Sequence, residues 1–147
     1  MSGHYTRLIK KRQSLVERFV EDKNKQMNKQ PICTDCCKIP KNWGYELIIV
    51  NNELYCGKIL VFKSGCKFSM HYHILKQETW FVNKGKFQFR WINTEDASLN
   101  SMELNVGEVV TIPRGMPHQL EAMEDGEIFE ISTQHFDSDS YRVWKGN

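Results

Sequence analysis

The chain has 147 residues, of which 40% are hydrophobic and 12% aromatic, and its formal net charge is +2. This length is typical of one domain, and it is enough to bury a core without disulfide bonds. The small net charge favours neither a nucleic-acid nor a membrane partner, and no apolar run is long enough to predict a transmembrane helix. The first residues also lack the apolar run of a signal peptide, so we expect a cytoplasmic protein.

Residues 6–29 are predicted to form an amphipathic helix, because apolar side chains recur there at helical spacing. A lone amphipathic helix is marginal in water, so this stripe should pack on its own domain or on a partner subunit, and we favour a homodimer. The stripe consists of Leu8, Ile9, Leu15, Val16, Phe19 and Val20. The rest of this helix is strongly charged and includes Lys10, Lys11 and Arg12. We expect this basic face to be exposed to solvent, and the alternative is that it binds nucleic acid. Residues 24–42 are polar and predict a linker, which gives an N-terminal segment of 1–42 and a domain of 43–147.

From residue 45 onward, short apolar or alternating runs follow one another and are separated by turn residues. This pattern predicts β-strands, and no helical period interrupts it. Many short strands at this spacing indicate a sandwich or a barrel. The predicted strands are 46–50, 55–62, 67–73, 79–82, 86–92, 101–104, 109–112, 118–122 and 127–133.

The first of two motifs reads Gly65-x5-His71-x-His73-x4-Glu78-x6-Gly85. Residues two apart on a strand point to the same face, so the imidazoles of His71 and His73 should project together. Glu78 begins the next predicted strand and can add a carboxylate oxygen. This spacing indicates a metal site rather than ordinary surface histidines.

The second motif reads Gly107-x5-Pro113-x-Gly115-x2-His118. Its proline and glycine suit a tight turn after a strand, which would direct His118 back to the same face. Three imidazoles and one carboxylate suit one divalent metal ion, and zinc, iron, manganese and nickel all accept this set.

The two motifs resemble those of the cupin superfamily over residues 65–122. The resemblance implies an all-β, single cupin barrel of the jelly-roll type with an N-terminal α-helix and a metal inside. The last position of the second motif departs from the family, since Ala122 replaces the usual asparagine.

A wider resemblance, over about residues 41–145, is to the single-domain or C-terminal cupin of type II mannose-6-phosphate isomerases. It rests on the Trp43-Gly44 element, on the segment from Phe68 to Trp80, and on a closing Glu130 strand with an acidic turn and arginine. The chain departs from that family at three positions, which carry His71, Lys76 and Thr79. Lys76 keeps a positive charge but lacks the planar fork of arginine.

The resemblance implies aldose–ketose isomerisation of a sugar or sugar phosphate through a metal-stabilised enediolate. It makes Glu130 a candidate general base, and Lys58 and Arg142 candidates for binding substrate. Arg90 is a further candidate if its side chain points into the barrel, but it shares a strand with Phe87, Phe89 and Trp91, and either set could face inward. Inward aromatic rings alone would give an apolar pocket, which disfavours a sugar phosphate.

Two other classes of function remain open. A cupin with three histidines and a glutamate can also be an iron-dependent dioxygenase, because the open metal positions can bind dioxygen. A non-catalytic sugar-binding or metal-binding module is the third possibility, since fold alone does not decide function.

Overall fold

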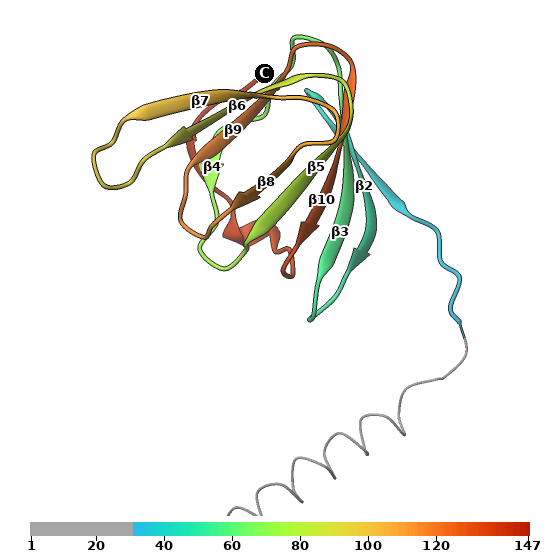
Figure 1. The fold of residues 1–147 in the computed structure, drawn as a ribbon. Helices are drawn as coiled ribbons and strands as arrows, with labels where there is room; N and C mark the ends of the chain where they lie inside the picture. The colour runs from blue at the N-terminus through green and yellow to red at the C-terminus, as the bar shows by residue number, and fades with distance from the viewer. Residues whose placement is uncertain (1–30) are drawn as a thin grey trace, which may run out of the picture. The chain divides into compact units, whose positions relative to one another are not determined.

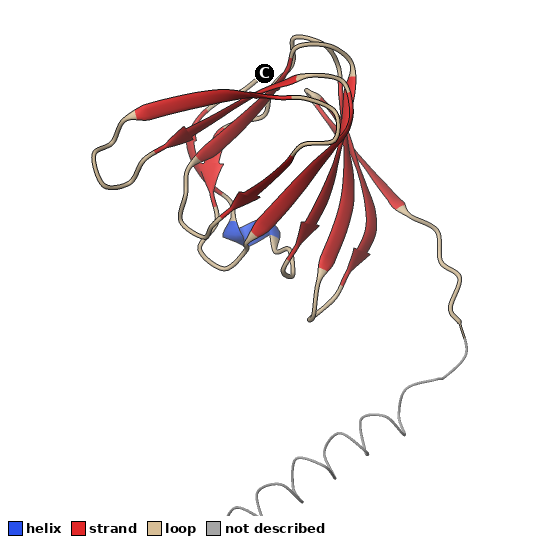
Figure 2. Cartoon of the chain, viewed as in Figure 1, coloured by secondary structure: helices blue, strands red, loops and turns tan. Residues whose placement is uncertain are grey.

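The computed structural model describes residues 31–147, and the chain divides into two units, Met1–Thr34 and Asp35–Asn147. The predicted helix over residues 6–29, with its apolar stripe, lies outside the described residues. Within the described part, the second unit consists of strands and one short 3₁₀ helix, Asp137–Asp139 (Figures 1 and 2). The strands are β1 (Cys37–Lys41), β2 (Gly44–Asn51), β3 (Cys56–Phe62), β4 (Met70–Tyr72), β5 (Glu78–Lys84), β6 (Phe87–Ile92), β7 (Leu99–Leu104), β8 (Val109–Ile112), β9 (His118–Ala122), β10 (Gly126–Ser132) and β11 (Tyr141–Trp144).

The strands form two antiparallel sheets, ordered β1-β2-β3-β10-β5-β8 and β11-β4-β9-β6-β7. The sheets face each other, as Figure 1 shows, and aromatic side chains from both meet between them. The ring of Trp80 in β5 lies 5.7 Å from that of Phe89 in β6, and the ring of Phe62 in β3 lies 5.4 Å from that of Phe87 in β6. The all-β, jelly-roll prediction is therefore confirmed as two facing sheets.

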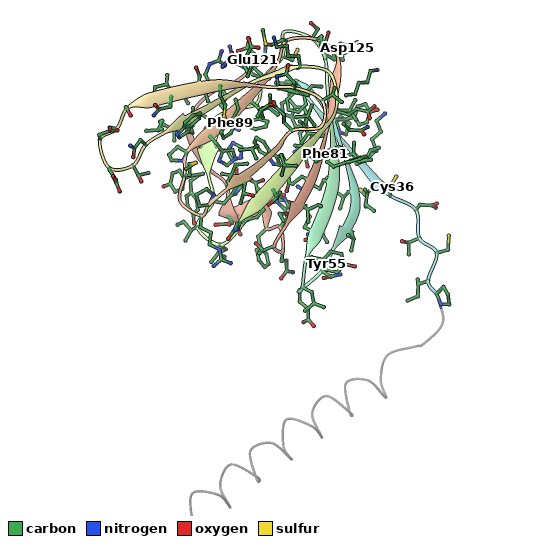
Figure 3. The ribbon with its side chains drawn as sticks, viewed as in Figure 1. Cys36, Tyr55, Phe81, Phe89, Glu121 and Asp125 are labelled. Atoms are coloured by element: carbon green, nitrogen blue, oxygen red, sulfur yellow. The ribbon has the colours of Figure 1, made fainter. Side chains whose placement is uncertain are left out.

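The core follows from the period of two in the strand sequences. Along β3, buried and half-buried residues alternate, and β5 shows the same pattern up to its last two residues. Inward residues such as Leu60 and Val82 are apolar, so each strand places one face in the core. Figure 3 shows the side chains that fill the space between the sheets.

Two strands, β1 and β11, were not predicted. Residues 37–41 belonged to the expected linker, but they pair with β2 over a tight turn from Lys41 to Gly44. Gly44 has φ +148°, and a Cβ there would collide with the carbonyl oxygen of Val61. Both strands lie at sheet edges with mostly exposed residues, so neither carries the alternation that reveals a half-buried strand. The first sheet consequently begins before the expected boundary between residues 42 and 43.

All five cysteines of the chain lie within residues 31–147. Cys33, Cys36 and Cys37 are exposed, and all the cysteines of this part are free. The histidines at residues 71, 73 and 118 form the group that could hold a metal ion, and the cysteines do not contribute to it. No helix in this part of the chain is both long enough and apolar enough to cross a membrane.

Candidate metal centre

The two sequence motifs meet where β4, β5 and β9 begin or end. His71 lies in β4 and pairs directly with His118, the first residue of β9. His73 follows the end of β4, and Glu78 is the first residue of β5. The amide of Gly115, which has φ +78°, donates to the carbonyl of His73 at 2.7 Å. The turn of the second motif is therefore attached to the strand of the first.

A backbone carbonyl holds one ring nitrogen of each histidine. Nδ1 of His71 lies 2.7 Å from the carbonyl oxygen of Ser69, and Nδ1 of His118 lies 2.9 Å from that of Met116. Nδ1 of His73 lies 2.5 Å from the carbonyl oxygen of Asp139. Because a carbonyl only accepts, each Nδ1 carries the proton and each Nε2 presents a lone pair, as metal-binding histidines require.

These Nε2 atoms converge. Ligand atoms of the three histidines lie within 4.8 Å of one another. Oε2 of Glu78 lies 3.0 Å from Nε2 of His118 and 3.7 Å from Nε2 of His73, and these three atoms are buried without a hydrogen-bond partner in the described chain. Acceptor atoms this close repel unless a proton or a cation lies between them. Three imidazoles and a carboxylate thus fit a divalent ion such as zinc, iron, manganese or nickel.

The charges of these residues support the same conclusion. Burial lowers the pKa of His71 to about 3, and His118 beside it acts in the same direction. Burial and the nearby Lys76 lower the pKa of His73 to about 4. Burial opposes the charge of Glu78, but the contacts with His118 and Lys76 outweigh it and hold the pKa of this carboxyl well below its usual range. At neutral pH His71 and His73 are therefore neutral imidazoles, and Glu78 is a carboxylate.

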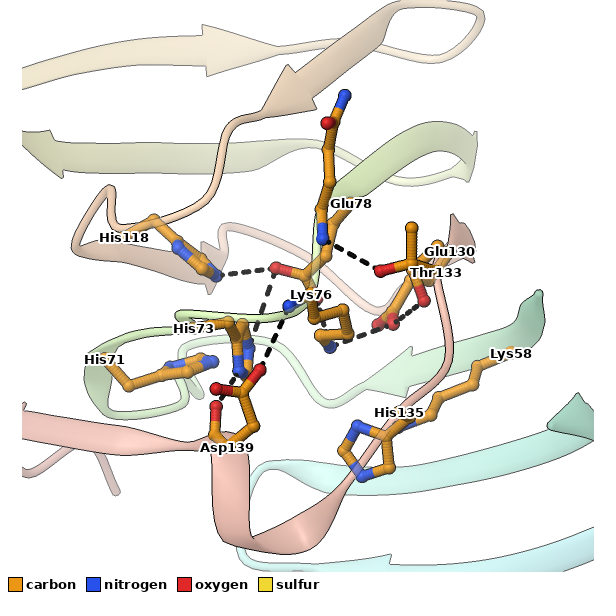
Figure 4. Close-up of polar contacts among 12 residues, drawn as sticks. Lys58, His71, His73, Lys76, Glu78, His118, Glu130, Thr133, His135 and Asp139 are labelled. Atoms are coloured by element: carbon orange, nitrogen blue, oxygen red, sulfur yellow. Dashed lines mark hydrogen bonds and ion pairs between the residues drawn. The ribbon is translucent and has the colours of Figure 1, made fainter. Parts of the chain in front are cut away.

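A buried ion-pair network adjoins the cluster (Figure 4). Nζ of Lys76 lies 2.5 Å from Oε1 of Glu78 and 3.1 Å from Oε1 of Glu130, and all three side chains are almost completely buried. The hydroxyl of Ser132 also donates to Oε1 of Glu130. Burial disfavours the charge on Lys76, but the two carboxylates outweigh it and raise the pKa of Lys76 above its ordinary value. The network thus keeps a charged lysine between the two glutamates.

Asp139 holds the loop that connects β4 to β5. Its carboxylate accepts hydrogen bonds from the amides of Ile74, Leu75 and Lys76 at 2.9–3.2 Å. Only 3% of Asp139 is exposed, so its carboxylate depends on these amides for its hydrogen bonds. One residue from the C-terminal segment therefore fixes the loop that carries both His73 and Lys76.

A cavity of about 480 Å³ opens beside the histidines. It is lined by residues from β1, β2, β3, β5 and β10, and by the segment that follows β10. In the wall of the cavity, the carboxylate of Glu46 pairs with Lys58 at 3.2 Å and with Lys41 at 3.3 Å. Burial opposes the charge of Glu46, but these two lysines lower its pKa. The cavity is therefore polar and charged along its length.

The structure places three of the four further candidate residues in this cavity. Lys58, Glu130 and Arg142 all line it. Arg90 does not line it: its guanidinium pairs with Glu121 at 2.6 Å on the outer side of β6. Of the two alternatives for this strand, the aromatic rings therefore face inward, and the charges of the cavity come from other strands. The physical reason is the alternation of β6, which places the apolar rings of Phe87 and Phe89 in the core.

Sequence reasoning missed three residues of the site, Lys76, Asp139 and His135. The sequence shows Lys76 as a replacement for arginine, and its place between His73 and Glu78 in the first motif is the signal that could have assigned it to the site. Asp139 belongs to the acidic turn after β10, but no local pattern reveals that its carboxylate contacts residues 74–76. His135 lines the cavity and pairs with Asp137.

Solved structures with a similar fold include CapF and oxalate decarboxylase. The capsular polysaccharide assembling protein CapF from Staphylococcus aureus is 21% identical, with a TM-score of 0.68 over 77% of this chain and 33% of CapF. Oxalate decarboxylase from Bacillus subtilis is 15% identical, with a TM-score of 0.67 over 80% of this chain and 34% of the decarboxylase. The chain spans about a third of the length of each, and at these identities the likeness concerns the fold.

A further match is oxalate decarboxylase from Lactobacillus farciminis in complex with formate. It is 16% identical and has a TM-score of 0.66 over 78% of this chain and 37% of that protein. No curated protein sequence matches the chain. Residues 58–132, which include the histidine cluster, Lys76, Glu78 and Glu130, match the family model of the cupin domain, and the chain belongs to this family.

Proposed function

We propose that the protein is a metal-dependent cupin enzyme that isomerises a sugar or sugar phosphate between its aldose and ketose forms. In this proposal His71, His73, Glu78 and His118 hold one divalent ion. When bound, the ion would supply Lewis acidity to a substrate carbonyl. The observation that carries the proposal is the position of Glu130, a buried carboxylate at the cavity wall beside the candidate ligands.

Glu130 is suited to move a proton between neighbouring carbon atoms. Both of its contacts, with Lys76 and Ser132, use Oε1. The other oxygen, Oε2, makes no hydrogen bond within the described residues and is free to approach a substrate in the cavity. A carboxylate held in one orientation by a charged lysine is a suitable general base, because geometry must be right before proton transfer is efficient. An aldose–ketose isomerisation moves one proton between the two carbons and a second proton from the hydroxyl oxygen of one carbon to the carbonyl oxygen of the other. Glu130 would carry the proton that moves between the carbons.

The size of the cavity fits a small molecule. Its volume of about 480 Å³ lies within the range of about 300–1,000 Å³ that is typical of small-molecule sites. Lysines, glutamates, histidines and Arg142 line it, together with Trp43, Trp80 and Phe68. Such a wall can bind sugar hydroxyl groups by hydrogen bonds and pack aromatic rings on the sugar carbons.

The ion-paired group of Lys41, Lys58 and Glu46 in the cavity wall favours an anionic substrate. Two lysines, Lys41 and Lys58, share the single carboxylate of Glu46, which leaves one positive charge in excess. Arg142 lines the same cavity and makes no ion pair within residues 31–147. These groups support binding of a phosphate by Lys58 and Arg142. CapF, a structural neighbour, is named as a polysaccharide-assembling protein, which is consistent with a carbohydrate substrate here.

The sharpest test measures, in the absence of dioxygen, whether hydrogen on the carbon atoms of a sugar exchanges for deuterium. Metal-loaded protein would be incubated in D₂O under anaerobic conditions with a panel of aldose and ketose phosphates, and the sugars followed by NMR. We expect interconversion of one aldose–ketose pair, with deuterium at the carbon beside the carbonyl. Glu130→Gln should abolish both, while Glu127→Gln, on the same strand but outside the cavity, should retain both.

Two outcomes would contradict the proposal. A reaction that needs oxygen would indicate the dioxygenase class instead. Sugar binding detected by thermal shift, with no exchange at carbon, would indicate a non-catalytic module.

A further inference from the structure

The two oxygens of Glu78 have different surroundings. Oε1 contacts Nζ of Lys76 at 2.5 Å, whereas Oε2 faces the Nε2 atoms of His118 and His73. Only Oε2 belongs to the group of buried atoms without a hydrogen-bond partner. One oxygen is thus already engaged by a cation of the chain, and the other faces the space between the imidazoles.

The position of Lys76 is itself fixed from three directions. Its amide donates to Oδ2 of Asp139 at 3.0 Å, and its Nζ contacts both Glu78 and Glu130. Only 4% of its side chain is exposed, so water does not compete for these contacts. Figure 4 shows its side chain between the two glutamates. Lys76 therefore cannot release Oε1 without leaving a buried carboxylate oxygen unpaired.

We propose that Lys76 is a positioning residue that restricts Glu78 to one ligand oxygen and so keeps a metal position available for substrate. This inference rests on the metal site of the proposed function, but not on isomerase activity. Carboxylates bind metal ions through one oxygen or through both. If Oε1 were free, it could take a second position on the ion, and one fewer would remain for a substrate oxygen.

The number of water molecules on bound Mn²⁺ tests this role directly. Manganese prefers six ligands, so four from the protein leave two positions for water. Water on the ion exchanges with bulk water and enhances the relaxation of its protons. In Lys76→Met, which keeps the length of the side chain but removes its charge, Glu78 should use both oxygens. The relaxation enhancement should fall by about half, since one of two waters is lost, while the affinity for Mn²⁺ stays the same or rises.

Three comparisons make the result specific. Lys58→Met removes another buried lysine of the same cavity, one that pairs with Glu46, and should leave the relaxation unchanged. Lys76→Arg keeps the charge and should behave as the wild type. In a Glu78→Gln background there is no second carboxylate oxygen, so adding Lys76→Met should not change the relaxation any further. Where the single variant Lys76→Met fails to fold, Lys76→Met combined with Glu130→Gln tests the role, because it leaves one fewer unpaired carboxylate, keeps Glu78 intact and should show the same loss of one water.

Two results would overturn the inference. One is an unchanged relaxation enhancement in Lys76→Met with Mn²⁺ bound. The other is a parallel loss of metal affinity and thermal stability without loss of bound water, as a merely structural lysine would produce. Wild-type protein that binds Mn²⁺ but isomerises no sugar would contradict the proposed activity and leave this test intact.

Discussion

The backbone carbonyl of Asp139 lies 2.5 Å from Nδ1 of His73, although 66 positions separate the two residues in the chain. The carboxylate of the same aspartate accepts from the backbone amides of residues 74–76. A residue beyond the matched cupin region of 58–132 thus orients one candidate ligand and fixes the loop that follows it. This relationship joins the stability of the fold to the geometry of the metal centre.

Asp139→Asn should weaken both the stability of the fold and the binding of metal. The amide group of asparagine has one acceptor oxygen and would point donors at backbone amides that need an acceptor. We expect the free energy of unfolding to fall by about 1–3 kcal/mol, and the affinity for a divalent metal to fall with it. Denaturant titration and calorimetric metal titration measure the two effects. Asp137→Asn is the matched control, because that side chain is fully exposed in the same turn. Lost stability with unchanged metal affinity would show that Asp139 does not position His73.

His73→Ala should abolish stoichiometric metal binding, because it removes one of three converging imidazoles. Elemental analysis of protein purified without added metal provides the measurement. His135→Ala is a stringent control, since His135 lines the same cavity but does not belong to the converging group. Metal content that is equal in the wild type and in His73→Ala would contradict the ligand assignment.

The metal-free protein should lose stability on acidification. The pKa is about 3 for His71 and about 4 for His73 in the folded state, against an ordinary value of 6.5. Between these values the unfolded chain binds more protons than the folded one, so the free energy of unfolding falls as the pH falls from about 6.5 toward 4. The depressed pKa of Glu78 acts in the same direction at lower pH. Denaturation series at several pH values measure the slope, and His71→Gln should reduce it. A slope of opposite sign would show that these imidazoles are protonated in the folded protein.

Two arginines should behave differently toward an anionic sugar. Arg142 lines the cavity, so Arg142→Ala should weaken binding of an active sugar phosphate by about 1.5–3 kcal/mol, or roughly tenfold or more. Arg90→Ala should leave binding unchanged and cost less than about 1 kcal/mol of stability, because the pair with Glu121 is partly exposed. Calorimetric titration of both variants measures the difference. A loss confined to Arg90→Ala would place the substrate outside the cavity described here.

The sequence alone was sufficient for the all-β class and for the group of candidate ligands. Alternation with a period of two reveals strands that bury one face, as β3 and β5 do, and the same period places His71 and His73 together. These patterns are local, because side-chain direction along a strand follows from its backbone. Mostly exposed edge strands carry no such signal, and β1 and β11 were missed for that reason.

The tertiary structure decided which face of β6 is buried and which distant residues meet at the site. Alternation defines two faces of a strand, but only packing against the opposite sheet places Phe89 inside and Arg90 outside. Two contacts at the site likewise join residues more than fifty positions apart: the ion pair of Lys76 with Glu130, and the hydrogen bond from His73 to the carbonyl oxygen of Asp139. Contacts of this kind depend on how the chain closes its long loops, and no short-range pattern in the sequence specifies them.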